Sequence, residues 1–311
     1  MKRPLLVLFD GNAIIHRAYH AFQSSRSPVI LTVSKTGEVV SAVYGFTQML
    51  LKTLNELKPT HYAIAFDKKG PTFRHQLFDQ YKAHRPPTPP ELISQLDRVR
   101  QMVEAFRIPI FELDGYEADD LLGTLSHQAS KQDVDTIIVT GDADAMQLVS
   151  PHVKVLYPEH RKSFSDAVLF DEAAVTRKYG VKPEQITDLK GLVGDPSDNI
   201  PGVPSVGPMN ASRLIQQFGT IEEIYAHIDE VTPLRIQRLL RENEAIARQS
   251  KHLATIVIEA PAELKLNECQ MGQYDRETVN ELFRELEFVR LRDRLPEMGA
   301  GAETSEAPPA S

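Results

Sequence analysis

The sequence predicts an α/β domain with a mostly parallel sheet, followed by a smaller helical domain. In the first half of the 311 residues, short apolar runs alternate with longer segments of helical periodicity. After about residue 172, strand-like runs almost vanish and helical segments dominate. We therefore expect a first domain over residues 1–172, a helical domain over 173–295, and a disordered tail or linker over 296–311, which is rich in Ala, Gly, Glu, Ser and Pro.

The first domain is expected to contain four strands, each a short apolar run. They cover residues 5–9, 61–66, 108–113 and 136–140. Apolar residues at helical spacing predict the helices between them, over residues 43–57, 91–106 and 117–128. Strands that alternate with helices form parallel sheets, and ligands of such sheets lie beyond the carboxyl ends of the strands.

The second domain is expected to consist of helices over residues 183–193, 209–218, 221–228, 233–249 and 276–288. Between the first two lies a turn with the sequence Asn199-Ile200-Pro201-Gly202-Val203-Pro204-Ser205-Val206-Gly207. A tight turn that opens a helix can present backbone N–H groups to a phosphate of duplex DNA. Taken alone, the same residue types suit any turn between helices.

Acidic residues gather at the strand ends and helix starts of this scheme. Asp10, Asp67 and Asp142 follow three predicted strands, so we expect their side chains at one edge of the sheet. Further acids come in short spacings that place pairs on one face of a turn or a helix start. The candidates are Asp10, Asp67, Glu117, Asp119, Asp120, Asp142, Asp144, Asp195 and Asp198.

Such a set of anions requires cations to neutralise it. Carboxylate oxygens without histidine or thiolate ligands favour Mg²⁺ or Mn²⁺ over zinc. Ligands for two ions predict two-metal phosphodiester hydrolysis, in which one ion generates the attacking hydroxide and the other stabilises the leaving oxygen. Any single acid of this kind is more often a helix cap or a solvated surface group, as we expect of Asp114, Asp133 and Asp135. A haloacid-type phosphatase needs a second aspartate two residues after Asp10, where this chain has Asn12.

A basic segment follows Asp67. Residues 68–85 hold five Lys or Arg and one acid, for a local charge of +4. The cations could clamp the phosphate that is cut, and Phe73 and Tyr81 could stack on unpaired bases. Arg17, on the helix expected after Asp10, could orient a carboxylate or a phosphate, and a plain salt bridge is an alternative.

Composition limits the other possibilities. The single cysteine, Cys269, excludes an internal disulfide framework and a cysteine-based zinc site. No run of about 18 apolar residues exists, and the N-terminus lacks the pattern of a signal peptide, so a cytoplasmic protein without a membrane span is expected. The formal net charge of −8 argues at first against nucleic acid as a partner.

Together these residues resemble the bacterial 5′ nuclease family, which comprises the 5′–3′ exonuclease domain of DNA polymerase I and stand-alone relatives and is similar to flap endonucleases. The resemblance spans about residues 5–295. It rests on Leu8-Phe9-Asp10-Gly11, Tyr44-Gly45-Phe46, Phe66-Asp67, Thr72-Phe73-Arg74-His75, Tyr81-Lys82 with Arg85, and the segments 116–122, 141–148 and 194–207.

The resemblance implies a PIN-like domain joined to a helix–two-turn–helix domain that carries a helix–hairpin–helix. It implies that the nine acids hold two or more Mg²⁺ or Mn²⁺ ions. It also implies that Arg74, Lys82 and Arg85 lie in a gateway for a single 5′ strand, with Lys82 and Arg74 on the scissile phosphate. The hairpin, with Gly202, Val203, Ser205 and Gly207, would grip duplex DNA with the help of a monovalent cation such as K⁺.

Two departures from the family pattern stand out. The family usually has Gly-Ile-Gly-Glu-Lys-Thr-Ala after the hairpin, whereas this chain has Ser205-Val206-Gly207-Pro208-Met209-Asn210-Ala211. Met209 replaces the lysine, so a phosphate contact is lost there. Met146 replaces a leucine before Gln147, a swap that conserves volume.

The expected function is therefore a divalent-metal-dependent 5′–3′ exonuclease and 5′ flap endonuclease, which removes RNA primers or displaced flaps in replication and repair. We expect DNA with 5′ ends, flaps or nicks as substrate, a monomeric protein, and a DNA polymerase as partner in the same chain or a separate one. The alternatives are the N-terminal nuclease portion of a DNA polymerase I, a PIN-like ribonuclease, and a DNA-binding module without activity.

The acidic total does not contradict a DNA partner. Setting aside the nine proposed metal ligands changes the formal charge from −8 to +1, and residues 68–85 carry +4 locally. The local distribution of charge, rather than its sum, is informative about the partner.

Overall fold

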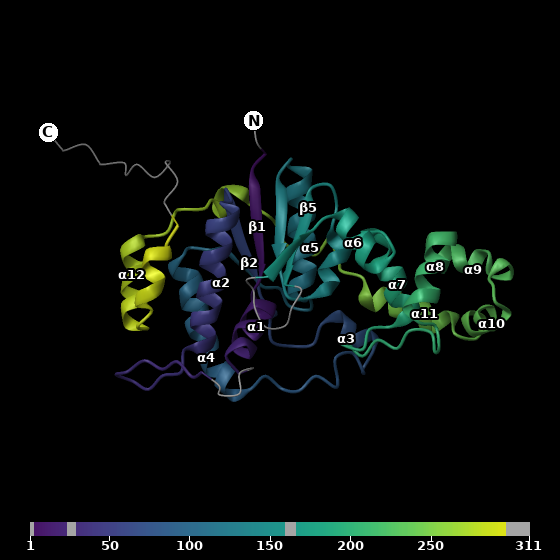
Figure 1. The fold of residues 1–311 in the computed structure, drawn as a ribbon, viewed down its shortest axis with the longest axis horizontal. Helices are drawn as coiled ribbons and strands as arrows, with labels where there is room; N and C mark the ends of the chain where they lie inside the picture. Colours follow the sequence, from purple (N-terminus) through teal and green to yellow (C-terminus); the bar gives the residue numbers. More distant parts are fainter. Residues whose placement is uncertain (1–2, 24–28, 159–165, 297–311) are drawn as a thin grey trace.

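A computed structural model describes residues 3–23, 29–158 and 166–296 of the chain. A six-stranded sheet lies in the middle with helices on both faces, and residues 172–254 form a helical arm that extends to one side (Figure 1). The expected α/β fold with a mostly parallel sheet and a helical part is confirmed. Of the expected tail at 296–311, everything from residue 297 on lies outside the described residues.

The strand order of the sheet is β3-β2-β1-β4-β5-β6, parallel throughout except that β6 is antiparallel to β5. The strands are β1 (Leu5–Asp10), β2 (His61–Ala65), β3 (Ile110–Phe111), β4 (Asp135–Val139), β5 (Val153–Pro158) and β6 (Ala167–Phe170). The first four match the predicted strands, although β3 keeps only two residues. β5 and β6 are additional, because their half-exposed residues lack the continuous apolar run of a fully buried strand.

Both faces of the central strands are buried. In β1, Leu6 and Leu8 pack on the side of α5 (Ala118–Lys131), whereas Val7 and Phe9 pack on the opposite side. This alternation explains why the strand is apolar at every position. The helices on the second side are α1 (Gly11–Gln23), α2 (Ser41–Leu57), α4 (Pro90–Ala105) and α12 (Arg276–Glu285).

The helical arm contains six α-helices. They are α6 (Glu172–Tyr179), α7 (Ile186–Val193), α8 (Pro208–Phe218), α9 (Ile221–Ala226), α10 (Leu234–Glu242) and α11 (Glu244–Ala254). The single helix expected over 233–249 is wrong, because the chain breaks at Asn243, whose side-chain amide donates to the carbonyl of Leu239 at 2.8 Å. Shorter elements are α3 (Phe73–Leu77) and the 3₁₀ turns at Ala143–Leu148, Pro183–Gln185, Ile228–Glu230, Leu266–Cys269 and Val289–Arg294.

Residues 255–264, which we call the return segment, leave the arm and run along α5. Three side chains of α5, spaced four residues apart, accept backbone N–H groups from it at 2.7–3.0 Å: Asp120 from Val257, Thr124 from Ala260, and Gln128 from Leu264. The approach is close enough that a Cβ on Gly123 would lie 2.7 Å from Ile256 Cγ2. The absence of a side chain at Gly123 therefore lets the return segment lie directly on α5.

The last described residues return to the sheet. Tyr274, Phe283 and Phe288 are buried against α2 and α4, on the side opposite α5. The division of the chain at residue 172 stays a prediction, and this packing places residues 274–295 beside the first domain. Among the described residues, no helix combines the length and apolarity required to cross a lipid bilayer.

Candidate metal centre

The candidate site lies where the strand order reverses, at the carboxyl ends of β1 and β4. Asp10 is the last residue of β1, Asp67 follows β2, and Asp142 follows β4. Loops from neighbouring parallel strands leave in opposite directions at such a point and open a crevice between them. A cavity of about 650 Å³ is lined there by five acids: Asp10, Asp67, Glu117, Asp119 and Asp142. We call them the sheet-edge cluster.

Asp10 is held inside this cavity by neutral donors. Its Oδ2 accepts a hydrogen bond from the Thr140 hydroxyl at 2.6 Å, and its Oδ1 accepts from the Ala13 N–H at 2.9 Å. Burial, reinforced by the charges of Asp67 and Asp142, raises the pKa of Asp10 to about 7. No lysine or arginine is among its hydrogen-bond or ion-pair partners within the described residues.

Asp67 is fixed in a similar way. It accepts from the Asn12 side-chain amide at 2.9 Å and from the Ala118 N–H, the first residue of α5, at 2.7 Å. Asn12, whose identity argues against phosphatase chemistry, is thus a residue that positions a carboxylate. The N-terminus of α5 adds a favourable dipole at the same carboxylate.

Asp119 has an unsatisfied carboxylate oxygen in the described structure. Its Oδ1 is buried and has no hydrogen-bond partner among the described residues. Burial and the charges of Asp142 and Asp10 raise its pKa well above the ordinary value. A buried, unpartnered carboxylate oxygen beside other carboxylates is the donor set that a hard divalent cation requires.

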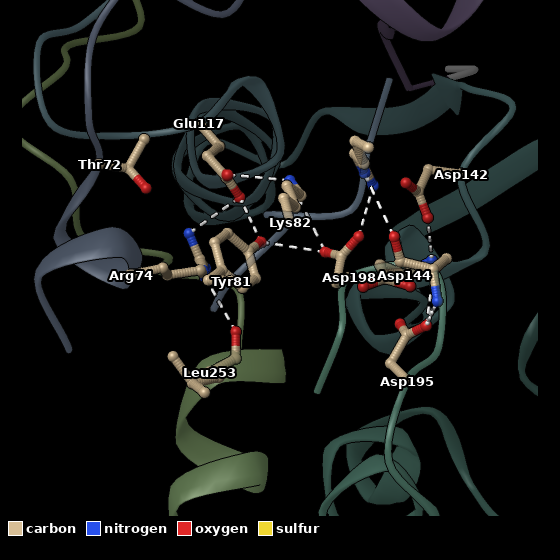
Figure 2. Close-up of polar contacts among 12 residues, drawn as sticks. Thr72, Arg74, Tyr81, Lys82, Glu117, Asp142, Asp144, Asp195, Asp198 and Leu253 are labelled. Atoms are coloured by element: carbon tan, nitrogen blue, oxygen red, sulfur yellow. Dashed lines mark hydrogen bonds and ion pairs between the residues drawn. The ribbon is translucent and has the colours of Figure 1, made fainter. Parts of the chain in front are cut away.

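A second group lies toward the helical arm. Asp144, Asp195 and Asp198 each offer a carboxylate oxygen, and these atoms lie within 4.8 Å of one another. We call them the arm-side cluster (Figure 2). Its environment differs from that of the sheet-edge cluster, because basic side chains already contact all three carboxylates.

Lys190, on α7, is the central cation of the arm-side cluster. Its ammonium donates to Asp144 and, at 2.5 Å, to Asp195. Burial opposes its charge, but the two carboxylates raise the pKa of Lys190 above its ordinary value. Burial and the neighbouring Asp142 raise the pKa of Asp144 to about 7, although Lys190 acts in the opposite direction.

Asp120 has a different environment from the one expected of a metal ligand. It is fully buried and forms a two-point ion pair with Arg74, with both N–O distances 2.8 Å. It also accepts from the N–H groups of Glu117 and Val257, at 3.1 and 2.9 Å. These four contacts occupy both of its oxygens, so the geometry does not favour a metal there.

Arg74 likewise lies away from the place expected of a phosphate contact. Beyond Asp120, it donates to the carbonyls of Leu253 and Thr255, at 2.9 and 2.7 Å, and its side chain is 3% exposed. Figure 2 shows it beneath Glu117, near the end of α11. We therefore assign Arg74 to the joint between α5, α3 and the helical arm.

Three later residues of the basic segment contact Glu117 or Asp198. The Tyr81 hydroxyl lies 2.9 Å from Glu117 and 3.0 Å from Asp198, and the Lys82 ammonium lies 2.9 and 3.7 Å from them. Arg85 forms an ion pair with Asp198. Tyr81 is buried, so it does not present the stacking surface expected for a base. Phe73 is half-buried beside Tyr116, at a ring distance of 5.9 Å.

The hairpin residues divide into a buried and an exposed pair. Gly202 donates its N–H to the Ser250 hydroxyl at 3.2 Å, and Val203 donates to the carbonyl of Leu192 at 2.8 Å. Both are buried, so their backbone donors are used inside the arm. Ser205 is exposed and Gly207 is half-buried at the start of α8, so this part of the hairpin faces solvent.

Arg17, Lys82 and Arg85 line the same cavity as the sheet-edge cluster. The structure adds residues that the sequence analysis does not select: Lys190, Thr140, and the cavity-lining His16 and His20. The signal for Lys190 is its position in a helix five residues before Asp195; Thr140 directly follows the strand β4. Neither spacing is distinctive without the fold.

Comparison with known sequences gives two adjoining family matches. Residues 5–180 match the 5′–3′ exonuclease N-terminal resolvase-like domain, and residues 181–277 match the 5′–3′ exonuclease C-terminal SAM fold. DNA polymerase I of Chloroflexus aurantiacus is 44% identical over 312 residues, which cover 99% of this chain and 32% of that protein. DNA polymerase I of Bacillus subtilis is 40% identical, over 98% of this chain and 34% of that protein. The chain thus spans about a third of the length of these relatives.

Solved structures share the fold at low sequence identity. The T5 D15 protein co-crystallised with metal ions superposes with a TM-score of 0.67 at 16% identity, covering 92% of this chain and 99% of the other. The catalytic core of Rad2 in complex with a DNA substrate superposes with a TM-score of 0.59 at 17% identity, covering 91% and 87%.

Proposed function

The chain belongs to the 5′–3′ exonuclease family, and from this premise we propose that it is a divalent-metal-dependent 5′–3′ exonuclease and structure-specific 5′ flap endonuclease that hydrolyses DNA. The observation that carries the proposal is the sheet-edge cluster, in which five acids line one cavity whose walls also hold Arg17, Lys82 and Arg85. Acids that can hold a metal beside cations that can hold a phosphate suit metal-dependent phosphodiester hydrolysis.

We propose that Asp10, Asp67, Glu117, Asp119 and Asp142 hold one divalent ion, and Asp144, Asp195 and Asp198 a second. The raised pKa of Asp10 and the unpartnered oxygen of Asp119 support a cation in the first position. All-oxygen carboxylate donors favour Mg²⁺ or Mn²⁺. Such ions, when bound, lower the pKa of a coordinated water and stabilise the leaving oxygen.

The basic side chains would orient the nucleic acid. Lys82 is paired with Glu117, and Arg85 is paired with Asp198. A phosphate that enters the cavity would replace these carboxylates as the partner of the two cations. Arg17 and half-buried Phe73 would contact the same strand. Arg74 would act indirectly, because its ion pairs with Glu117 and Asp120 hold the start of α5 in place.

The helical arm would bind the duplex next to the cut. Ser205 and Gly207 supply the exposed end of the hairpin, and a K⁺ ion could assist there as in the resembling family. Met209, 85% exposed at the start of α8, offers no charge to a phosphate. We therefore expect a weaker grip on duplex DNA than with a lysine at this position.

The similarity to DNA polymerase I supports a polymerase as partner, in the same chain or separately. Substrates would be 5′ flaps, nicks and RNA primer–DNA hybrids in replication and repair, cleaved in the cytoplasm by a monomer. The domain division at residue 172 belongs to the same proposal.

The test is cleavage of a labelled 5′-flap duplex with Mg²⁺ by the wild type, by Asp142→Asn and by Asp114→Asn. Asp114 is a suitable control because its exposed carboxylate pairs only with Lys68 in the described structure. We expect cleavage by the wild type and Asp114→Asn, and loss of at least about a hundredfold with Asp142→Asn. Equal rates for all three proteins, or faster cleavage of single-stranded RNA than of the flap, would contradict the proposal.

A further inference from the structure

The arm-side cluster differs from the sheet-edge cluster in what neutralises it. Asp144 and Asp195 share the Lys190 ammonium, and Asp198 is paired with Arg85 and lies 3.7 Å from Lys82. Three carboxylates thus face three side-chain cations. Asp10 and Asp67, in contrast, receive hydrogen bonds from Thr140, Ala13, Asn12 and Ala118, which carry no charge.

We propose that Lys190 is a built-in counter-ion of the arm-side cluster, and that a second divalent ion binds there only when the Lys190 ammonium moves away. This inference rests on the proposed metal-dependent function. The ammonium contacts one oxygen of Asp144 and one of Asp195, and both carboxylates belong to the set whose oxygens lie within 4.8 Å of each other. The two cations therefore compete for the same carboxylates.

The two clusters then differ in affinity for a metal ion. At the sheet-edge cluster a divalent ion relieves repulsion among buried carboxylates such as Asp10 and Asp119, because in the described structure the ion pairs of this cluster with Lys82 and Arg74 are made by Glu117 alone. At the arm-side cluster the ion must break two ion pairs before it forms its own contacts. The protein is thus expected to bind one ion tightly and a second more weakly.

Local structure allows Lys190 to leave and return. The residue lies near the end of α7, and its long side chain is 16% exposed, so the ammonium can move toward solvent without moving the helix. Asp195 would remain fixed meanwhile, because its other oxygen accepts from the N–H and the hydroxyl of Ser197, at 2.8 and 2.6 Å.

A permanent structural ion pair is the alternative, and binding of Mn²⁺ alone distinguishes the two. We would titrate the wild type, Lys190→Met, Lys190→Arg and Lys182→Met with Mn²⁺ and count free ion by electron paramagnetic resonance. Lys182 is an exposed lysine of the same arm and serves as the matched control. Removing the Lys190 charge is expected to tighten the weaker site by at least about tenfold, since the ammonium no longer repels an incoming cation or holds two of its ligands. The tight site should stay unchanged in all four proteins.

A second measurement uses only the wild type and so does not depend on the folding of a variant. Lysine acylation is followed by mass spectrometry as Mn²⁺ is raised through both binding ranges. Lys190 is expected to become several-fold more reactive over the second range only, whereas Lys182 should not change. An unchanged Lys190 reactivity through saturation of both sites would overturn the proposal. So would an unchanged or weaker second site in a folded Lys190→Met protein.

Neither measurement requires nuclease activity. If flap cleavage fails but Lys190→Met tightens the second site, the inference about the counter-ion stands and the proposed reaction fails. If cleavage occurs but Mn²⁺ binding is the same with and without Lys190, the reaction stands and the counter-ion inference fails.

Discussion

Arg74 and Asp120 meet in a two-point ion pair, with both N–O distances 2.8 Å and both side chains buried. Arg74 also donates to the carbonyls of Leu253 and Thr255, so it connects α5 to the last turn of α11 and to the return segment. The pair stands next to the cavity of the sheet-edge cluster and not inside it. Asp119, the neighbour of Asp120 in sequence, lines the cavity instead.

Asp120→Asn is expected to lower the free energy of unfolding by about 3–5 kcal/mol, because it breaks the buried two-point pair and leaves Arg74 with Glu117, at 3.3 Å, as its remaining carboxylate partner. Urea unfolding measures the change. Mn²⁺ affinity of the folded protein should not change. Asp114→Asn, which removes an exposed ion pair, is the control and should change stability by less than about 1 kcal/mol. A stable Asp120→Asn protein with weakened Mn²⁺ binding would show that Asp120 is a metal ligand after all.

Asp119→Asn is expected to act in the opposite direction. The substitution removes a buried carboxyl whose pKa is raised by burial and by Asp142 and Asp10, so the metal-free protein at pH near 8 should gain about 1 kcal/mol of stability. Mn²⁺ affinity at the tight site should fall at least about tenfold. A loss of stability together with unchanged Mn²⁺ binding would argue that Asp119 is a structural residue.

The pH dependence of stability should report Asp10 together with Asp144, whose pKa is also raised to about 7. The pKa of Asp10 in the folded protein lies above the ordinary carboxyl value, so the folded state holds a proton that the unfolded state has lost. Stability of the metal-free protein should therefore fall as the pH rises from about 4 to about 7. Thermal unfolding across this range measures the slope, and Asp10→Asn should make it shallower. An identical slope of stability against pH in the wild type and in Asp10→Asn would contradict the assignment.

Gly123→Ala is expected to destabilise the protein by about 1–3 kcal/mol. The added methyl would lie 2.7 Å from Ile256 Cγ2 and 3.0 Å from the carbonyl oxygen of Val257, so the return segment must shift away from α5. Chemical unfolding checks the value. Gly207→Ala is the matched control, because nothing lies within 4 Å of its Cβ position and its φ is −88°. Equal stability of the two variants would mean that the return segment adapts freely.

Met209→Lys should strengthen binding to duplex DNA and make it more dependent on salt. The side chain is 85% exposed at the first turn of α8, beside the open end of the hairpin. One added phosphate contact steepens the slope of log affinity against log salt by about 1. Fluorescence anisotropy at several salt concentrations gives the slope, with Lys182→Met as a reference for a nonspecific change in charge. An unchanged slope would place the hairpin away from the DNA.

The sequence was sufficient to predict which acids meet at the sheet edge, but not which side chains those acids contact. Asp10, Asp67 and Asp142 each follow an apolar run, and the carboxyl ends of parallel strands must meet, so their convergence needs no side-chain detail. Glu117 and Asp119 come next at a helix start and join the same cavity. Strands β5 and β6 escape prediction because their burial depends on neighbours far away in the sequence.

The environment of Asp120 could not be predicted from its spacing alone. Its spacing of three residues from Glu117 predicts that the two share a face, but Asp120 also begins a four-residue repeat with Thr124 and Gln128. The role of this polar repeat is evident only once the return segment is known to lie against it. The environment of Tyr81 could not be predicted either. An aromatic residue among cations predicts base stacking, whereas in the structure the Tyr81 hydroxyl lies between the carboxylates of Glu117 and Asp198.

Early and late segments of the chain pack together around this sheet. Asp10 belongs to the first strand, yet α5 is overlaid by the return segment at 255–264, and α2 and α4 are overlaid by residues 274–295. A nascent chain that has produced every proposed metal ligand, up to Asp198, therefore still lacks these outer contacts on both sides of the sheet. Ordering of the start of α5, where Glu117 and Asp119 lie, depends in part on Val257, which donates its N–H to Asp120 and is made after all of them.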